Sequence, residues 1–371
     1  HRLRSRMPLP LRVRAATGAR PTARLAALPV LFTLGFAACG GDDDPTGPGT
    51  PSLSRVAAVY IDTAIDWEQE VSYWTSRIDW PRVRRDAPAK TPAAQTMRDA
   101  YPAVQFTIDS VLRPLGDTPA LFFPRDNSPG LVDAPDSSPR NIVTGSSTLV
   151  PGIAYLSVPG FTGRSLAGRA DSTLAMVRQL DATAPCGWIL DLRLNLGGYF
   201  GAIMTSLSPL IANSRFGGVR FADGGELEFF IQDGQVGFFD PASNRSFAQP
   251  GTGTVTYRLQ RPNAPVAILQ GINTASAGEI LVLAFRGGPV PHRTFGAPTR
   301  GATSSPIGMY MPDSAYLNIT AGLWYDRSKT LLNGPIPVDQ PVAGSSVPAA
   351  GQNDAVVQAA TTWLRSLPAC A

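Results

Sequence analysis

Residues 265–285 read PVAILQGINTASAGEILVLAF, and this stretch carries the pattern that decides the fold. Pro265–Gln270 is an uncharged run typical of a buried strand, and Ala275–Arg286 is predicted to be a helix. A buried strand that passes through a short turn into a helix is the repeating unit of proteins with crossover connections. The stretch therefore predicts an α/β core.

The same alternation continues toward the N-terminus, where a helix predicted from Leu166 to Val177 lies between two short apolar runs. Turn signals at Asp223-Gly224-Gly225 and Asp233-Gly234 predict hairpins within residues 216–260. The other predicted elements of this part are strands at Ile153–Val158 and Gly187–Leu192, a helix that begins near Gly198, and a final helix at about 353–366.

Residues 56–115 are predicted to be helical. Val104, Ile108, Val111 and Leu115 recur at spacings of four, three and four, which places them on one helix face. Residues 124–150 are rich in proline and serine and are predicted to form a loop.

The first 38 residues have the composition of an export signal. Seven arginines and no acid precede an uncharged run, LAALPVLFTLGFAA, and the small residues Ala37 and Ala38 then stand before Cys39. This run is too short to span a bilayer, which needs about 20 residues, but it fits the apolar part of a signal peptide. We expect a bacterial lipoprotein signal cleaved before Cys39, which would then carry lipid on the periplasmic or outer-membrane side of the cell envelope. The alternative is a plain secretory signal.

Removal of that segment changes the charge of the chain. The whole sequence has 32 basic and 28 acidic residues and a net charge of +4, and loss of the seven signal arginines leaves 25 against 28, a net −3. The basic character therefore belongs to the signal, and we expect no nucleic-acid partner, because such binding needs a basic patch on the folded domain.

The cysteines and histidines are scattered along the chain, and their spacing does not match a metal site. Cys186 and Cys370 either pair outside the cytoplasm or stay as buried thiols. The changes in composition along the chain predict its organisation. The predicted parts are a signal peptide at 1–38, a flexible linker at 39–54, a helical segment at 55–123, a loop at 124–150 and a β/α core at 151–371.

Two junctions between a strand and a helix contain the candidate catalytic residues. The first, Asp191–Gly198, reads DLRLNLGG. Its paired glycines, Gly197 and Gly198, let main-chain N–H groups approach a reacting oxygen without a Cβ in the way, next to the positive end of a helix dipole. The alternative is a tight turn with buried Asp–Arg pairing.

The second junction, Asn273–Glu279, reads NTASAGE. It places Ser276 at the rim of the sheet and offers the N–H of Ala277 to an oxyanion, as in a nucleophile on a sharp turn from strand to helix. The alternative is structural, because Ser276 and Glu279 have the spacing of a capping box.

Five motifs in a fixed order make the chain resemble the carboxyl-terminal-processing (tail-specific) serine peptidase family, in the branch close to the tricorn protease core. The resemblance runs from about Ile65 to Trp363. The motifs are Ile78-Asp79-Trp80, the two junctions, Thr294–Gly301 (TFGAPTRG) and Gly334–Asp339 (GPIPVD).

This resemblance implies a crotonase-like (ClpP-like) β/α core behind a helical N-terminal segment. It makes Ser276 the nucleophile, Ala277 with Gly197 or Gly198 the oxyanion donors, and Glu279 the acidic residue of the serine motif. The implied substrate is a peptide or unfolded protein outside the cytoplasm, cleaved through an acyl-enzyme, and no cofactor is implied.

The chain departs from the family at the general base. One branch uses a lysine where this chain has Gly296-Ala297-Pro298. The other uses a His-Ser pair in an LGDxHS motif, and the matching stretch here reads LGDTPA, with Pro119 and Ala120 at the two positions. A serine nucleophile without a base is weak.

The sequence therefore leaves two functions open. One is a serine peptidase, and the other is a catalytically impaired relative that binds peptides or hydrophobic ligands in the same cleft. His292 is predicted to be a surface residue at a strand start, with a substitute base as the alternative. The 32 residues between Ala120 and Ile153 are too few for a tail-binding PDZ module.

Overall fold

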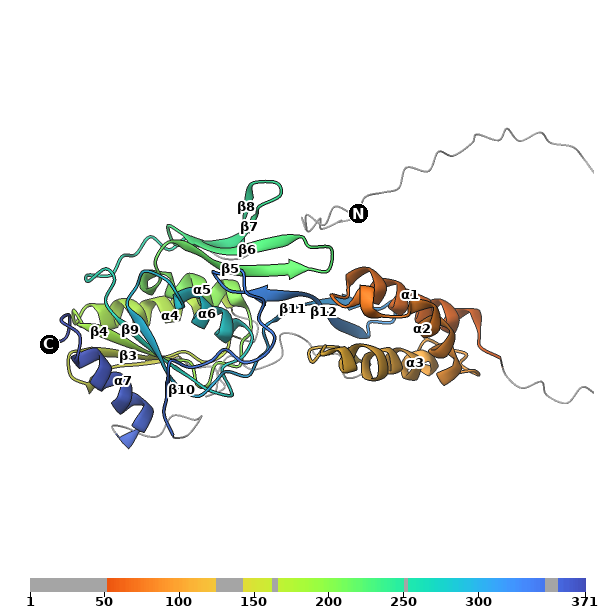
Figure 1. Ribbon diagram of the computed structural model, residues 1–371, viewed down its shortest axis with the longest axis horizontal. Coiled ribbons are helices and arrows are strands. Elements are labelled where there is room, and N and C mark those ends of the chain that lie inside the picture. The colour runs from red at the N-terminus through yellow and green to blue at the C-terminus, as the bar shows by residue number, and fades with distance from the viewer. Residues whose placement is uncertain (1–51, 125–142, 162–165, 250–252, 344–352) are drawn as a thin grey trace, which may run out of the picture. The chain divides into compact units, whose positions relative to one another are not determined.

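The computed structural model describes residues 52–124, 143–161, 166–249, 253–343 and 353–371. Residues from Thr50 onward form one compact unit that contains two β-sheets and seven α-helices among the described residues (Figure 1). The predicted signal and Cys39 lie outside the described residues.

A six-stranded sheet forms the centre of the core. Its order is β13-β10-β9-β4-β3-β2, and all neighbours run parallel except β2, which is antiparallel to β3. The strands are β2 (Thr144–Val150), β3 (Ile153–Ser157), β4 (Gly187–Asp191), β9 (Val266–Gln270), β10 (His292–Gly296) and β13 (Gln340–Pro341).

Both faces of this sheet are covered, which is the usual condition for parallel strands. Trp188 and Leu190 of β4 pack toward α4 (Leu166–Asp181), α5 (Phe200–Leu207) and α6 (Ala277–Phe285). Ile189, between them, packs on the opposite face toward α7 (Ala355–Arg365). The alternation of the strand thus feeds two separate hydrophobic cores.

A second sheet of seven strands packs on the far side of α5 and α6. Its order is β1-β12-β5-β6-β7-β8, and β11 also pairs with β12. The strands are β1 (Leu121–Phe123), β5 (Ser214–Phe221), β6 (Glu226–Gln232), β7 (Gln235–Asp240), β8 (Arg245–Ala248), β11 (Ser304–Tyr310) and β12 (Tyr316–Tyr325).

The helical segment forms a third core around the outer part of the β11–β12 hairpin. It contains α1 (Arg55–Val71), α2 (Trp80–Asp86) and α3 (Tyr101–Phe106), which continues as a π-helical turn at Thr107–Leu112. Ser54 caps α1 and Asp79 caps α2. Leu317 and Ile319 of β12 are fully buried in this core.

The α/β fold class and its crotonase-like core are confirmed, and the strands and helices predicted after residue 151 are present within a few residues of the predicted bounds. Two predictions were wrong in detail. Residues 144–150, predicted to be loop, form β2, because Thr and Val side chains suit an edge strand despite the polar sequence. The π turn shifts the buried face after Ile108 from Val111 to Leu112.

In the part of the chain that the structure describes, no helix combines the length and the apolar composition needed to span a bilayer.

Candidate active site

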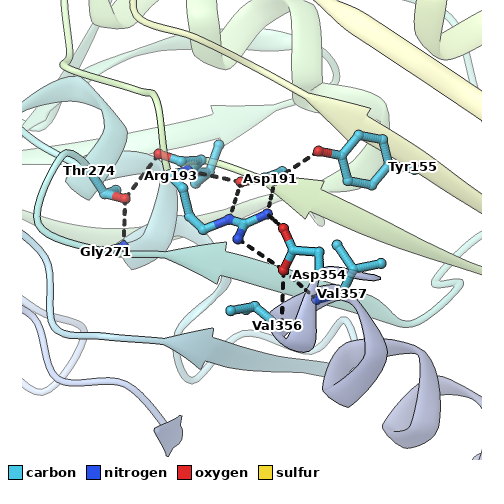
Figure 2. Close-up of polar contacts among 9 residues, drawn as sticks. Tyr155, Asp191, Arg193, Gly271, Thr274, Asp354, Val356 and Val357 are labelled. Atoms are coloured by element: carbon cyan, nitrogen blue, oxygen red, sulfur yellow. Dashed lines mark hydrogen bonds and ion pairs between the residues drawn. The ribbon is translucent and has the colours of Figure 1, made fainter. Parts of the chain in front are cut away.

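Ser276 lies in the turn between β9 and α6 in a strained backbone conformation. Its φ is 51° and its ψ −120°, a region that costs a residue with a side chain about 1–3 kcal/mol. The turn is held from both sides. The Thr274 hydroxyl donates to the Leu192 carbonyl (2.9 Å) and accepts the Gly271 N–H (3.0 Å; Figure 2). The fold therefore enforces this conformation.

The glycine junction lies directly against the serine turn. A Cβ added to Gly197 would stand 2.7 Å from the Ser276 Cβ and 3.2 Å from the Ala277 nitrogen. The Ala275 N–H also donates to the Asn195 carbonyl (2.9 Å). Two segments about eighty residues apart in sequence are thus in contact, and only glycine fits at position 197.

Two main-chain N–H groups at this contact have no acceptor in the part of the chain that the structure describes. The Gly197 N–H donates to Asn195 Oδ1 (3.0 Å), whereas neither the Gly198 N–H nor the Ala277 N–H donates to any described residue. Gly198 is exposed and has a φ of 113°. Of the two glycines predicted as oxyanion donors, Gly198 is therefore the one whose N–H is free.

Glu279 is fully buried and serves the main chain of the serine turn. Its Oε2 accepts the Ser276 N–H (2.8 Å), and its Oε1 accepts the Gly301 N–H (2.8 Å) and the Thr299 hydroxyl. Burial raises the pKa of this carboxyl group, and these hydrogen bonds oppose the rise. The predicted capping box is present, but the Glu279 side chain makes no hydrogen bond to the Ser276 hydroxyl.

No histidine, lysine or carboxyl side chain of the described residues is hydrogen-bonded to the Ser276 hydroxyl. Lys329 binds Glu226 (2.8 Å) and Glu228 (2.6 Å), and Lys90 lies over the Phe106 ring. These are the two lysines of the chain, and both are engaged elsewhere.

His292 is excluded as a substitute base by its place in the sheet. It is half-buried and begins β10, as predicted, and it pairs with Val266 at the start of β9, whereas Gly296 pairs with Gln270 at the end. Four residues of strand span about 13 Å, and Ser276 follows the far end of β9. The imidazole Nδ1 instead contacts the Val290 carbonyl (2.8 Å).

Pro119 and Ala120 belong to a turn that is well anchored without the family's histidine. The Pro119 carbonyl accepts a hydrogen bond from Asn318 (3.0 Å), and Ala120 is fully buried. Asp117, two residues earlier, is buried and accepts both the Thr320 hydroxyl (2.8 Å) and the Thr320 N–H (3.1 Å). Burial raises the pKa of Asp117 against these bonds.

Arg193, within the Asp191–Gly198 junction, forms a buried ionic network with Asp191 and Asp354 (Figure 2). It is 1% exposed and binds Asp191 (2.7 Å) and Asp354 (2.8 Å), and the Tyr155 hydroxyl donates to Asp191 (2.8 Å). Asp354 also caps α7. The predicted Asp–Arg pairing is therefore present. The sequence predicted a helix at about 353–366, and no local signal paired Asp354 with Arg193.

The C-terminal helix is tied to the core at its other end as well. Cys186 and Cys370, whose pairing the sequence left open, form a disulfide with a Cα–Cα distance of 5.0 Å. Both ends of the α7 region are thus attached close to β4, the strand that leads into the glycine junction.

A family model for peptidase family S41 matches residues 152–342, which is more than half of the chain. The chain belongs to peptidase family S41. The predicted family is therefore confirmed, and the branch without a PDZ module stays a prediction.

Similar proteins extend over most of the chain. A nisin-resistance protein of Lactococcus lactis subsp. lactis is 23% identical over 283 residues, which cover 76% of this chain and 81% of the relative. A lipoprotein from Streptococcus agalactiae has a TM-score of 0.64 at 18% identity, over 85% of this chain and 98% of its own. A photosystem II D1 C-terminal processing protease has a TM-score of 0.54 at 13% identity, over 82% and 97%. At these identities the solved structures show the fold.

Proposed function

We propose that this S41 peptidase relative binds peptide segments outside the cytoplasm at the Ser276 turn and hydrolyses them far more slowly than a complete serine peptidase. In this proposal a peptide carbonyl is polarised by the free N–H groups of Gly198 and Ala277, and Ser276 faces its carbon. Glu279 holds the main chain of the nucleophile and is a positioning residue.

The observation that carries the proposal is that none of the described residues places a proton acceptor on the Ser276 hydroxyl. Acyl transfer requires the serine proton to leave as the new bond forms, and a positioned base contributes about 10²–10⁴-fold to such a step. His292 lies at the other end of the sheet, both lysines are engaged, and Pro119 and Ala120 have no group that takes a proton. Removal of the base from a catalytic triad leaves about 10³–10⁴-fold acceleration over water, which comes from binding and the oxyanion donors.

A second candidate, an active peptidase with acyl-enzyme chemistry on Ser276, is favoured by the strain at this residue. A residue keeps a φ of 51° at a cost only where the surroundings enforce it, and such strain is common at working nucleophiles. This candidate needs a base from outside the described residues, where residues 125–142 contain aspartates but no histidine or lysine.

The predicted export signal supports an extracytoplasmic location. Cys39 with its preceding apolar run is the proposed membrane anchor, and a similar fold occurs in a streptococcal lipoprotein. The disulfide between Cys186 and Cys370 also suits an oxidising compartment.

Glycine variants test whether peptides bind at this site. Gly197→Ala places a methyl group against Ser276. Gly224→Ala is the control: its φ is 83°, an added Cβ has no atom within 4 Å, and the variant introduces backbone strain alone. With a fluorescein-labelled pentapeptide of leucine and alanine, fluorescence anisotropy should show at least tenfold weaker binding for Gly197→Ala and unchanged binding for Gly224→Ala. Equal binding by both variants contradicts the proposed site.

Mass spectrometry of the same mixtures distinguishes the two candidates. The proposal predicts that the wild-type protein leaves the bound peptide intact over hours, while Pro119→His combined with Ala120→Ser increases cleavage. Rapid cleavage by the wild-type protein that is lost in Ser276→Ala would establish the active peptidase instead.

A further inference from the structure

The rim of the proposed peptide site carries exposed apolar side chains. Ile272, in the turn that leads to Ser276, is 54% exposed, and Leu196, which precedes Gly197, is 51% exposed. Full burial of such a side chain is worth about 1.5–3 kcal/mol. Two aliphatic groups left in water on either side of the Gly197–Ser276 contact therefore favour an apolar ligand next to the nucleophile.

Arg300 is attached to the same turn. Its N–H donates to the Thr274 carbonyl (2.9 Å), its Nε to the Ile272 carbonyl (3.2 Å), and its Nη2 reaches Asn273 Oδ1 at 3.4 Å. These contacts hold the guanidinium beside Ile272, a few residues before the nucleophile.

The charge of Arg300 is not neutralised by any described residue. The side chain is exposed, its two acceptors are the Ile272 carbonyl oxygen and the Asn273 amide oxygen, and no ion pair joins it to a carboxylate in the described part of the chain. The nearby Glu279 is buried and bound to main-chain N–H groups. A guanidinium has five N–H donors in a planar fork that matches a carboxylate, and here part of that fork has no partner.

The contacts of Arg300 set an upper limit on how far its guanidinium lies from the nucleophile. Asn273 and Ser276 are three residues apart, so their Cα atoms are at most about 11 Å apart, and the guanidinium lies 3.4 Å from Asn273 Oδ1. A ligand carboxylate at the guanidinium is therefore within a few residues of a peptide group at Ser276.

Resting on the proposed peptide site, we infer that Arg300 is a specificity-determining residue that binds a carboxylate of the ligand within a few residues of the carbonyl at Ser276. The ligand class is an apolar peptide with a negative charge at this spacing. The charge can be the free C-terminus or an acidic side chain, and both present the same group to the guanidinium.

Three peptides and three variants test the inference in the full mature protein. The probes are a fluorescein-labelled leucine and alanine pentapeptide with a free C-terminal acid, the same peptide as a C-terminal amide, and an amide with one internal glutamate. The variants are Arg300→Gln, Arg300→Lys and, as a matched control, Arg293→Gln, which removes an exposed arginine of β10. Circular dichroism checks that each variant is folded.

The wild-type protein should bind the free acid about tenfold more tightly than the amide, because a charge-assisted hydrogen bond adds about 1.4 kcal/mol. Arg300→Gln should reduce this ratio to about one. Arg300→Lys should keep part of the ratio, and Arg293→Gln should keep all of it. The peptide with internal glutamate identifies the source: binding like the free acid indicates a side-chain carboxylate, and binding like the amide indicates the chain terminus.

Equal wild-type affinity for the acid and the amide overturns the inference and leaves the proposed function standing, and so does a ratio that persists in Arg300→Gln. Failure of all three peptides to bind the wild-type protein contradicts the proposed function itself.

Discussion

The Ser276 turn and the Gly116–Ala120 turn are both well ordered by buried hydrogen bonds, but they keep different parts of the family's chemistry. Around Ser276 a carboxylate fixes the nucleophile's main chain, and two N–H groups stay free. In the other turn Asp117 binds Thr320, yet the side chains at positions 119 and 120 carry no titratable group.

This difference shows that structural and chemical roles can separate within one motif. Asp117 binds Thr320 of β12 whether or not position 119 is a histidine. The base can therefore be lost while the turn keeps its structure. In the Ser276 turn the two roles lie close together, because Thr274 and Glu279 hold the main chain that carries the Ala277 N–H proposed to bind a carbonyl group. The two turns are also linked, since the Thr320 hydroxyl contacts Ser304 (3.4 Å), three residues after the Gly301 that binds Glu279.

The largest effect on stability is expected from Gly198→Ala, which alters the glycine junction in contact with the Ser276 turn. An added Cβ would stand 2.0 Å from the Phe161 carbonyl oxygen, and the φ of 113° disfavours any side chain. We expect a loss of about 3–5 kcal/mol in the free energy of unfolding by urea denaturation, from backbone strain and overpacking together. Gly224→Ala, which meets nothing, should lose only about 1–2 kcal/mol. Similar losses would mean that the close approach to Phe161 is not important.

Asp354→Ala tests the support behind the glycine junction. It removes a helix cap and half of the pairing of a buried arginine, and we expect a loss of about 3–4 kcal/mol. Ser54→Ala removes the cap of α1 and one exposed hydrogen bond to the Gln95 carbonyl, and it should lose about 1 kcal/mol. Thermal or urea unfolding measures both. Equal losses would show that the Arg193 network adds nothing beyond capping.

Glu68→Gln tests the burial that surrounds the degenerate turn. Glu68 is fully buried near Asp117, it accepts the Thr107 hydroxyl (2.6 Å), and burial raises its pKa to about 8. The folded state therefore keeps the proton while the unfolded state releases it above about pH 4.5, so this residue lowers stability progressively from pH 4.5 to 8 and by a constant amount above pH 8.

The variant should remove that loss. We expect Glu68→Gln to gain on the order of 5 kcal/mol over the wild type at pH 9 relative to pH 4 in urea unfolding. Glu70→Gln, an exposed neighbour on the same helix, should show no such dependence. A pH-independent difference for Glu68→Gln would mean that Glu68 is ionised in the folded protein.

The sequence was sufficient for features that depend on local pattern. The strand and helix around Ser276, the glycine pair and the turns at Asp223 and Asp233 follow from spacing and composition, and the structure contains all of them. The contact of Gly197 with Ser276 followed from the order of the motifs in the family. The choice of Gly198 over Gly197 as a free donor did not, because it depends on the side-chain amide of Asn195.

Features that depend on distant partners could not be predicted. The Asp354–Arg193 pair joins residues 161 positions apart, and no local pattern indicates which buried charge a helix cap will meet. The π turn after Phe106 depends on packing against β12 and β1 rather than on periodicity. The polar strand β2 is stabilised by its pairing with β3, which its own composition does not show.

The central claim is that Ser276 is a positioned nucleophile without a base, and the rate of labelling by a fluorophosphonate probe tests it most directly. The account predicts slow labelling of the wild-type protein at Ser276, none in Ser276→Ala, and a rate at least about 10²-fold higher when Pro119→His and Ala120→Ser are combined. Wild-type labelling as fast as that of the double variant would contradict the account, because the chain would then already contain its base.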